Sequence, residues 1–114
     1  MDQSLFEIAV GPTVLLAAME KKGVTLCLEM LNSRVAEEMK GHPDYFCDDI
    51  DRSVEICRRV GSPRVKVLFD IYHEQVMAGD LVASIREHIQ WIGHFHTAGV
   101  PGRTDIDGSQ EINY

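Results

Sequence analysis

Hydrophobic and polar positions along the chain follow two different periods. Three segments carry apolar residues at helical spacing: residues 12–22, residues from about 44 to 60, and a segment after Tyr72 that Gly79 interrupts and Asp80 can restart as a helix cap. Three shorter segments are near-continuous apolar runs, as in strands covered on both faces: residues 24–31, 64–70 and 91–96. Helices and strands therefore alternate, and this order predicts an α/β fold with βαβ units and a parallel sheet.

Each predicted strand carries, at or near its carboxyl end, a side chain that can bind a metal or move a proton. These residues are Glu29, Asp70 and His96. Because neighbouring parallel strands end at the same edge of a sheet and lie about 4.8 Å apart, the three side chains can converge on one ion. Two carboxylates and an imidazole suit a divalent ion of the Mg, Mn or Co kind. Taken singly, Glu29 is more typical of a solvated or paired carboxylate, and Asp70 could simply cap the next helix.

The alternation of side chains along a strand predicts which neighbours share a face with the candidate ligands. Leu68 is expected to lie on the same face as Asp70. On the third strand, Ile92 and His94 are expected to share a face with His96. His94 taken by itself is more typical of a packed core histidine than of a metal ligand.

Length and composition indicate one small globular domain. The chain has 114 residues, of which 45% are hydrophobic and 25% charged. Its net charge of −7 and pI near 5.1 disfavour binding to a phosphate backbone. The nearest basic group is interpreted as the end of a helix and the start of a strand: Arg58, Arg59, Arg64 and Lys66.

Targeting signals and cysteine spacing point to the cytoplasm. No apolar run approaches the roughly 18 residues that a membrane span needs, and the first four residues, MDQS, lack the basic start of a signal peptide. The three cysteines form no CxxC motif and cannot all pair. We therefore expect a reduced, cytoplasmic protein without nucleic-acid or membrane partners.

Four short segments together resemble the hydroxypyruvate isomerase family: LEMLNSR at 28–34, FDIYH at 69–73, GVPGR at 99–103 and EINY at 111–114. That family belongs to the xylose-isomerase-like TIM barrels, which also include ketose 3-epimerases and an apurinic endonuclease branch. The resemblance covers the chain from about Lys21 to Tyr114. It implies that residues 12–114 form part of a (β/α)₈ barrel, with three strands that correspond to the fifth to seventh of the eight.

The resemblance also implies roles for individual residues. Glu29, Asp70 and His96 match three ligands of a divalent metal, Mg, Mn or Co, and Glu29 also matches a catalytic acid/base group. His73 matches a histidine near the substrate oxygens. Arg103 matches an arginine that faces the substrate, and its guanidinium would pair with a substrate carboxylate.

The activity that the resemblance implies is isomerisation of a small hydroxy-carbonyl compound or sugar acid. In the named family, hydroxypyruvate becomes tartronate semialdehyde through an enediolate. The metal would polarise the carbonyl, while carboxylates would remove a proton from one carbon and return it to the next.

The chain departs from the family pattern in two ways. The fourth ligand, a second Glu at the end of the last strand, has no counterpart; Glu111 follows an irregular loop without a strand and is interpreted as anchoring that loop. The first half of the barrel is also missing, and residues 1–11 look like a leader of unclear role. We therefore expect self-association or association with the missing barrel half. The alternative is an inactive half-barrel that acts as an interaction module, and an apurinic-endonuclease-like repair enzyme is a weaker third hypothesis.

Overall fold

A three-stranded parallel sheet forms the centre of the molecule. The computed structural model describes residues 13–114, so the predicted leader at residues 1–11 lies outside the described residues. Strands β1 (Leu26–Glu29), β2 (Val65–Asp70) and β3 (Ile92–His96) pair in the order β1-β2-β3, each parallel to its neighbour. The prediction of an α/β fold with a parallel sheet is therefore confirmed, with a first strand shorter than the apolar run at 24–31.

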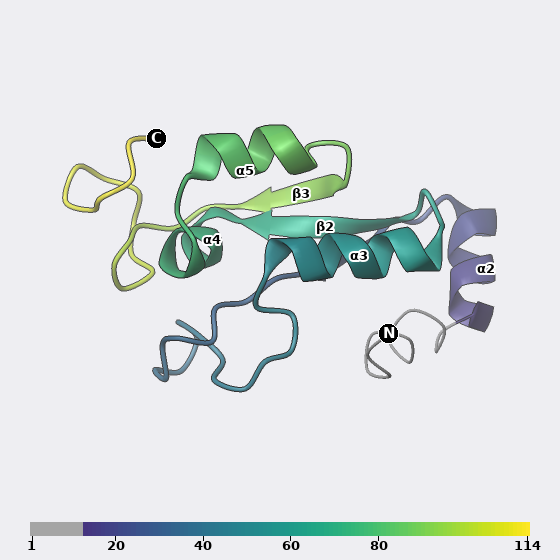
Figure 1. The fold of residues 1–114 in the computed structure, drawn as a ribbon, viewed down its shortest axis with the longest axis horizontal. Coiled ribbons are helices and arrows are strands. Elements are labelled where there is room, and N and C mark those ends of the chain that lie inside the picture. The colour runs from purple at the N-terminus through teal and green to yellow at the C-terminus, as the bar shows by residue number, and fades with distance from the viewer. Residues whose placement is uncertain (1–12) are drawn as a thin grey trace.

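Within residues 13–114, four helices accompany the sheet: α2 (Thr13–Lys22), α3 (Ile50–Val60), α4 (Ile71–Met77) and α5 (Leu81–His88). Figure 1 shows α3 along β2, α5 along β3, and α2 beyond the start of the strands. The hydrophobic core lies between α3 and one face of the sheet and is made by Met30, Ile50, Val54, Cys57, Val65, Val67 and Phe69. This helix-on-sheet packing leaves the carboxyl ends of the strands pointing toward α4 and the C-terminal segment (Figure 1).

Helix α3 begins later than its apolar pattern suggested. The expected start near Asp44 is wrong, because Asp44 has a left-handed backbone (φ 67°) that a helix cannot contain. The helix instead starts at Ile50, where the Asp49 side chain caps it by accepting a hydrogen bond from the Arg52 backbone N–H at 2.9 Å. The preceding segment is held by the backbone N–H of Leu31, which donates to the Cys47 carbonyl.

An irregularity in strand β3 puts one residue on the opposite face of the sheet from the one expected. Ile92 pairs with Val67, but the next pair is His94 with Leu68, so Gly93 is an extra residue in the ladder. Ile92 consequently packs against the core cluster with Val67, and the expectation that it shares a face with His96 is wrong. His94 and His96 do lie together, with ring centroids 5.3 Å apart.

The junction between α4 and α5 also differs in one detail. Asp80 stands at the N-cap position of α5, as expected, but its backbone is left-handed (φ 46°) and its side chain makes no capping hydrogen bond. Its carbonyl instead accepts a hydrogen bond from the Ser84 backbone N–H. The turn is therefore stabilised by the main chain rather than by the carboxylate.

Both outer strands are edges of the sheet within the described part of the chain. Strand β1 and strand β3 each pair only with β2, so each presents unpaired backbone N–H and C=O groups. Large apolar side chains on these edges are partly open to solvent, with Leu26 40% and Phe95 39% exposed. This open arrangement is consistent with part of a (β/α) barrel. No helix among residues 13–114 has the length and hydrophobicity to cross a membrane.

Candidate metal centre at the strand ends

The three predicted ligands converge at the carboxyl ends of the strands. Glu29, Asp70 and His96 are each the last residue of their strand, and Asp70 pairs directly with His96 in the ladder. The His96 Nδ1 atom lies 3.3 Å from a Glu29 carboxylate oxygen and 3.7 Å from Asp70 Oδ2. One imidazole nitrogen therefore stands between two carboxylates, as the alternation of strands and helices predicted.

Asp70 is fixed at this position by the helix that follows it. Its side chain is completely buried. Its Oδ1 atom accepts hydrogen bonds from the backbone N–H groups of Tyr72 (2.9 Å) and His73 (3.3 Å), so it caps α4. The Oδ2 atom stays free to face His96 and accepts a hydrogen bond from Arg103. The helix-cap interpretation and the metal-ligand interpretation of Asp70 thus apply to different oxygens of one carboxylate.

Arg103 reaches the site from the segment that follows β3. Its Nη2 atom donates to Asp70 Oδ2 at 3.0 Å, and its Nη1 atom lies 2.6 Å from His73 Nε2. Its guanidinium also lies over the Tyr72 ring, 5.2 Å from the centroid. The resemblance named Arg103 as a substrate contact, and the structure brings it beside Asp70 and His73.

A tight backbone turn positions Arg103. Gly99 and Thr104 exchange two backbone hydrogen bonds, of 2.7 and 3.2 Å. A Cβ atom at Gly99 would lie 2.5 Å from the Asp105 carbonyl oxygen, so only glycine fits this closure. Arg103 itself has a left-handed backbone (φ 54°) within the turn.

His73 is buried one turn into α4, and its ring is held by a residue that the sequence pattern did not single out. Its Nδ1 atom lies 3.0 Å from the backbone nitrogen of Asn32 and 2.7 Å from the side-chain nitrogen of the same residue. Burial lowers the pKa of His73 to about 4; Asp70 raises it and Arg103 lowers it further. His73 is therefore neutral at physiological pH.

Asn32 could have been suspected from its position. It is a fully buried polar residue three positions after Glu29, in the segment that leaves β1. Its side chain also ties down the following loop, because Oδ1 accepts from the Val35 N–H and Nδ2 donates to the Lys40 carbonyl. A short amide residue directly after an apolar strand is a signal of this kind, although it does not reveal the partner.

The donor set at the strand ends suits a divalent cation. A carboxylate oxygen of Glu29, one of Asp70 and a ring nitrogen of His73 lie within 4.8 Å of one another. His96 Nδ1 lies against both carboxylates, so the site offers two acidic groups and two imidazoles. Two carboxylates together with imidazole nitrogen fit Mg²⁺, Mn²⁺ or Co²⁺.

Comparison with known proteins agrees with this arrangement. A family model described as Xylose isomerase-like TIM barrel matches residues 13–113. The chain belongs to this family. A 2-oxo-tetronate isomerase of Cupriavidus necator is 39% identical over 93 residues, which is 82% of this chain. A Danio rerio protein named as a hydroxypyruvate isomerase is 34% identical over 96 residues, or 84% of the chain.

The similarity extends to solved structures. The crystal structure of an AP endonuclease, family 2, from Brucella melitensis superposes with a TM-score of 0.77 at 34% identity, over 87% of this chain and 36% of that chain. The present chain spans about one third of the length of the two isomerases named above. The family is therefore one of isomerase-type enzymes, and the open sheet corresponds to part of their barrel.

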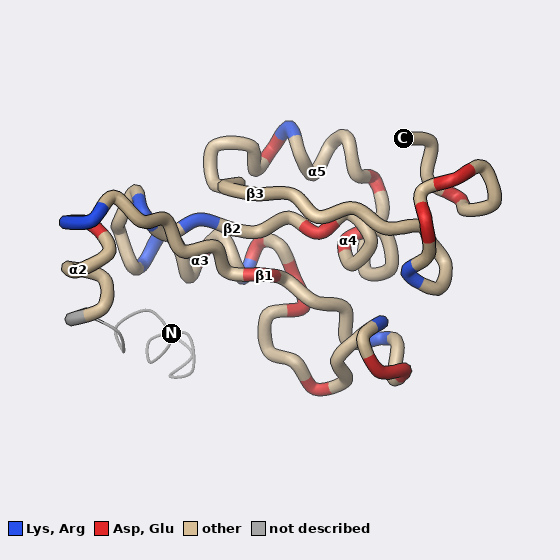
Figure 2. Tube along the Cα trace, turned by 180° about the vertical axis from the view of Figure 1, so that it is seen from behind, with Lys and Arg blue, Asp and Glu red and all other residues tan. Residues whose placement is uncertain are grey.

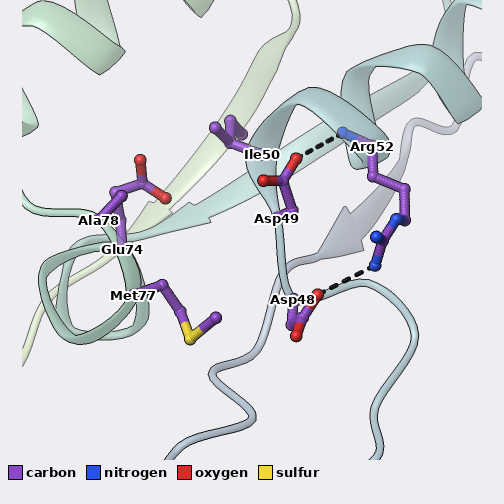
Figure 3. Close-up of a pocket in the computed structure, with 7 residues that line it drawn as sticks. All are labelled: Asp48, Asp49, Ile50, Arg52, Glu74, Met77 and Ala78. Atoms are coloured by element: carbon purple, nitrogen blue, oxygen red, sulfur yellow. Dashed lines mark hydrogen bonds and ion pairs between the residues drawn. The ribbon is translucent and has the colours of Figure 1, made fainter.

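Two other features lie apart from the strand ends. A cavity of about 180 Å³ lies between the segment before α3 and the end of α4, lined by Asp48, Asp49, Ile50, Arg52, Glu74, Met77 and Ala78 (Figure 3). The buried Glu74 carboxylate accepts a hydrogen bond from Ser84, and burial raises its pKa. Glu111 is exposed and accepts a hydrogen bond from Gln75 at 3.3 Å, in agreement with its interpretation as a loop anchor.

Proposed function

We propose that residues 13–114 carry part of the active site of a metal-dependent sugar-acid isomerase of the hydroxypyruvate isomerase type. What supports the proposal is the meeting of Glu29, Asp70 and His96 at adjoining strand ends, with Arg103 beside them. A divalent ion held by these three ligands would polarise the carbonyl group of a hydroxy-carbonyl substrate.

Glu29 is the group that we expect to move protons. Its carboxylate is half-buried at the end of β1, next to His96, where it can reach a carbon atom of a substrate held at the strand ends. In the isomerisation of hydroxypyruvate, the base removes a proton from the hydroxymethyl carbon, an enediolate forms, and a proton returns to the neighbouring carbon. The described residues bring no further carboxylate to this cluster beyond Glu29 and Asp70. A second acid/base group would therefore come from another part of a complete barrel.

The charges at the site favour a small anionic substrate. The two carboxylates together carry −2, Arg103 carries +1, and His73 is neutral, so these side chains by themselves attract a cation. With a divalent ion bound, the net charge of the site, ion included, becomes positive. Arg103 can then pair with the carboxylate of a sugar acid while His73 contacts a substrate oxygen.

The chain also needs a partner surface if it is to form a closed site. We propose that the edges of β1 and β3 pair with further strands, either from a second copy or from the remaining part of the barrel. The support is the pair of open edges and the one-third coverage of the isomerase relatives. Light scattering of the purified chain is expected to give an oligomer; a strictly monomeric chain that melts cooperatively would contradict this proposal.

A nuclease function has less support. The Brucella protein is named as an AP endonuclease, but a DNA repair enzyme needs a basic groove near its metal site. Figure 2 shows the basic positions gathered mainly near α2 and the start of β2, whereas acidic positions predominate toward the strand ends. The net charge of −7 points the same way.

The first test is calorimetric titration of the 114-residue chain with Mn²⁺, alongside the variant Glu29→Gln. We expect stoichiometric binding that the variant loses. The matched control is Glu111→Gln, which removes an exposed carboxylate away from the cluster and should bind like the unchanged chain. If the chain binds no Mn²⁺, or if Glu29→Gln binds as well as the control, the proposed site is wrong and the interaction-module alternative gains support. If binding holds, isomerase assays with hydroxypyruvate follow.

A further inference from the structure

Both ring nitrogens of His73 face hydrogen-bond donors. Nδ1 lies 3.0 Å from the Asn32 backbone nitrogen and 2.7 Å from its side-chain nitrogen, whereas Nε2 lies 2.6 Å from Arg103 Nη1. Backbone and guanidinium N–H groups can only donate. A neutral imidazole has a single lone pair in its ring plane, so only one of these two sides can be a true hydrogen bond.

The Asn32 side cannot rearrange to resolve the conflict. Its backbone N–H has a fixed direction, and its carbonyl oxygen is held by the His42 N–H at 2.8 Å. The side-chain amide cannot be flipped either, because Oδ1 accepts from the Val35 N–H and Nδ2 donates to the Lys40 carbonyl. In the flipped amide, the NH₂ group would face the Val35 N–H, a donor against a donor. The amide oxygen would face the Lys40 carbonyl, an acceptor against an acceptor.

The Arg103 side is the adaptable one. This side chain is 29% exposed and comes from a loop. Its guanidinium can therefore shift away from His73 Nε2, so that an acceptor group can lie between the two donors. Asn32 is fully buried and His73 nearly so. The lone pair of His73 therefore belongs on Nδ1, and the ring proton belongs on Nε2.

We infer that Asn32 is a positioning residue that fixes His73 in the tautomer protonated at Nε2. In this form, His73 presents an N–H donor beside the Asp70 carboxylate and next to Arg103. It can donate to a substrate oxygen but can neither accept a proton nor ligate a metal through Nε2, while Nδ1 is covered by Asn32. The inference deepens the proposed function, on which it rests. It leaves His96 as the imidazole ligand, and it sets two donors, His73 Nε2–H and the Arg103 guanidinium, side by side for a substrate oxygen that accepts from them.

The tautomer can be read directly by NMR. In the uniformly ¹⁵N-labelled 114-residue chain near neutral pH, long-range ¹H–¹⁵N correlation spectra distinguish protonated from unprotonated ring nitrogens for each histidine. The chain has five histidines, and the signals of His73 are those that disappear in His73→Gln. We expect His73 to show an unprotonated Nδ1 and a protonated Nε2. A protonated Nδ1, or two nitrogens averaged by exchange between tautomers, would overturn the inference.

A variant then tests whether Asn32 sets the tautomer. Asn32→Asp keeps the shape of the side chain but places an acceptor where Nδ2 donates, 2.7 Å from His73 Nδ1. We expect the Nδ1 signal to shift toward the protonated range, because only the backbone N–H of residue 32 then still donates to this atom. Asn113→Asp, at an exposed position, makes the same chemical change and should leave the His73 signals unmoved. An unprotonated Nδ1 in Asn32→Asp would refute the role of the side chain; if this variant does not fold, a protonated Nδ1 in the unchanged chain would still overturn the inference.

Failure of this inference can be distinguished from failure of the proposed function. The NMR measurement needs neither metal nor substrate, whereas the proposed function is tested by Mn²⁺ binding. A chain that binds Mn²⁺ with His73 protonated at Nδ1 would keep the metal site and lose the positioning role. A chain with the expected tautomer and no metal binding would keep the positioning role and lose the metal site.

Discussion

Replacement of Asp70 by two different residues separates its structural role from its metal-binding role. Asn keeps an oxygen that can cap α4 but removes the negative charge that faces His96 and Arg103. Ala removes both the cap and the charge. Because the lost contact to Arg103 and the relieved proximity to Glu29 are common to both variants, these effects cancel when the two variants are compared.

The expected difference in stability therefore comes from the helix cap alone. Asp70 Oδ1 accepts from two backbone N–H groups of α4, those of Tyr72 and His73. Loss of such a cap costs typically about 1 kcal/mol. We expect Asp70→Ala to unfold more easily than Asp70→Asn by that amount, measured by urea unfolding followed by circular dichroism.

Metal affinity is expected to fall alike in both variants. Removal of a group that merely orients a metal ligand typically costs about 10- to 100-fold in affinity, so loss of a direct carboxylate ligand should cost at least about 100-fold. The measurement is calorimetric titration with Mn²⁺. Asp107→Asn, a change at an exposed aspartate of the C-terminal segment, is the matched control and should retain the affinity of the unchanged chain.

If Asp70→Asn stays folded and binds Mn²⁺ stoichiometrically with unchanged affinity, Asp70 is not a ligand and its burial reflects helix capping and the Arg103 contact alone. If both variants lose Mn²⁺ binding but have equal stability, the metal assignment stands and the capping argument fails.

Three further changes test other parts of the structure. Glu74→Gln should raise the melting temperature at pH 7 and lose this advantage in acid. Burial raises the pKa of Glu74, so the folded protein loses stability as the pH rises above the ordinary range of a carboxyl group, and the neutral amide does not have this loss. A melting temperature below that of the unchanged chain at pH 7 would contradict this expectation. Asp49→Ala should destabilise the fold by about 1 kcal/mol in urea unfolding through loss of the α3 cap, while Asp49→Ser should restore most of it; equal stability of the two variants would count against the cap. Gly99→Ala should displace Arg103 and weaken the binding of a small carboxylate to the Mn²⁺-loaded chain in calorimetric titration, with Gly108→Ala, in open space, as the control; unchanged carboxylate binding would show that the turn does not position Arg103.

The sequence predicts those parts of the structure that depend on local patterns. Apolar runs that end on Glu29, Asp70 and His96 identify the strands and the edge where they finish, because a strand end is defined within a few residues. The same patterns place the start of α3 too early because Asp44 and Asp48 resemble the acidic first turn of a helix. Such a pattern does not reveal a left-handed residue that breaks the helix.

Features set by long-range contacts could not be found in the same way. The extra residue at Gly93 turns Ile92 toward the core, and only glycine fits there: a Cβ atom would lie 2.7 Å from Lys66 Cβ in β2 and 3.0 Å from Cys27 Sγ in β1. Strict alternation assumes a ladder without bulges, so it places Ile92 on the wrong face. The glycine signals that something lies close by, but not what it is.

The surroundings of His73 show how the two kinds of information combine. Its place in FDIYH, one helical turn after Asp70, follows from the sequence, but its hydrogen-bonding state does not, because its partners come from segments 41 residues before it and 30 residues after it. Asn32 enters from the end of β1 and Arg103 from the turn closed at Gly99. A sequence pattern can thus nominate the residues that meet a metal or a substrate, whereas the proton that one of them carries is decided by which donors the fold brings to each side of its ring.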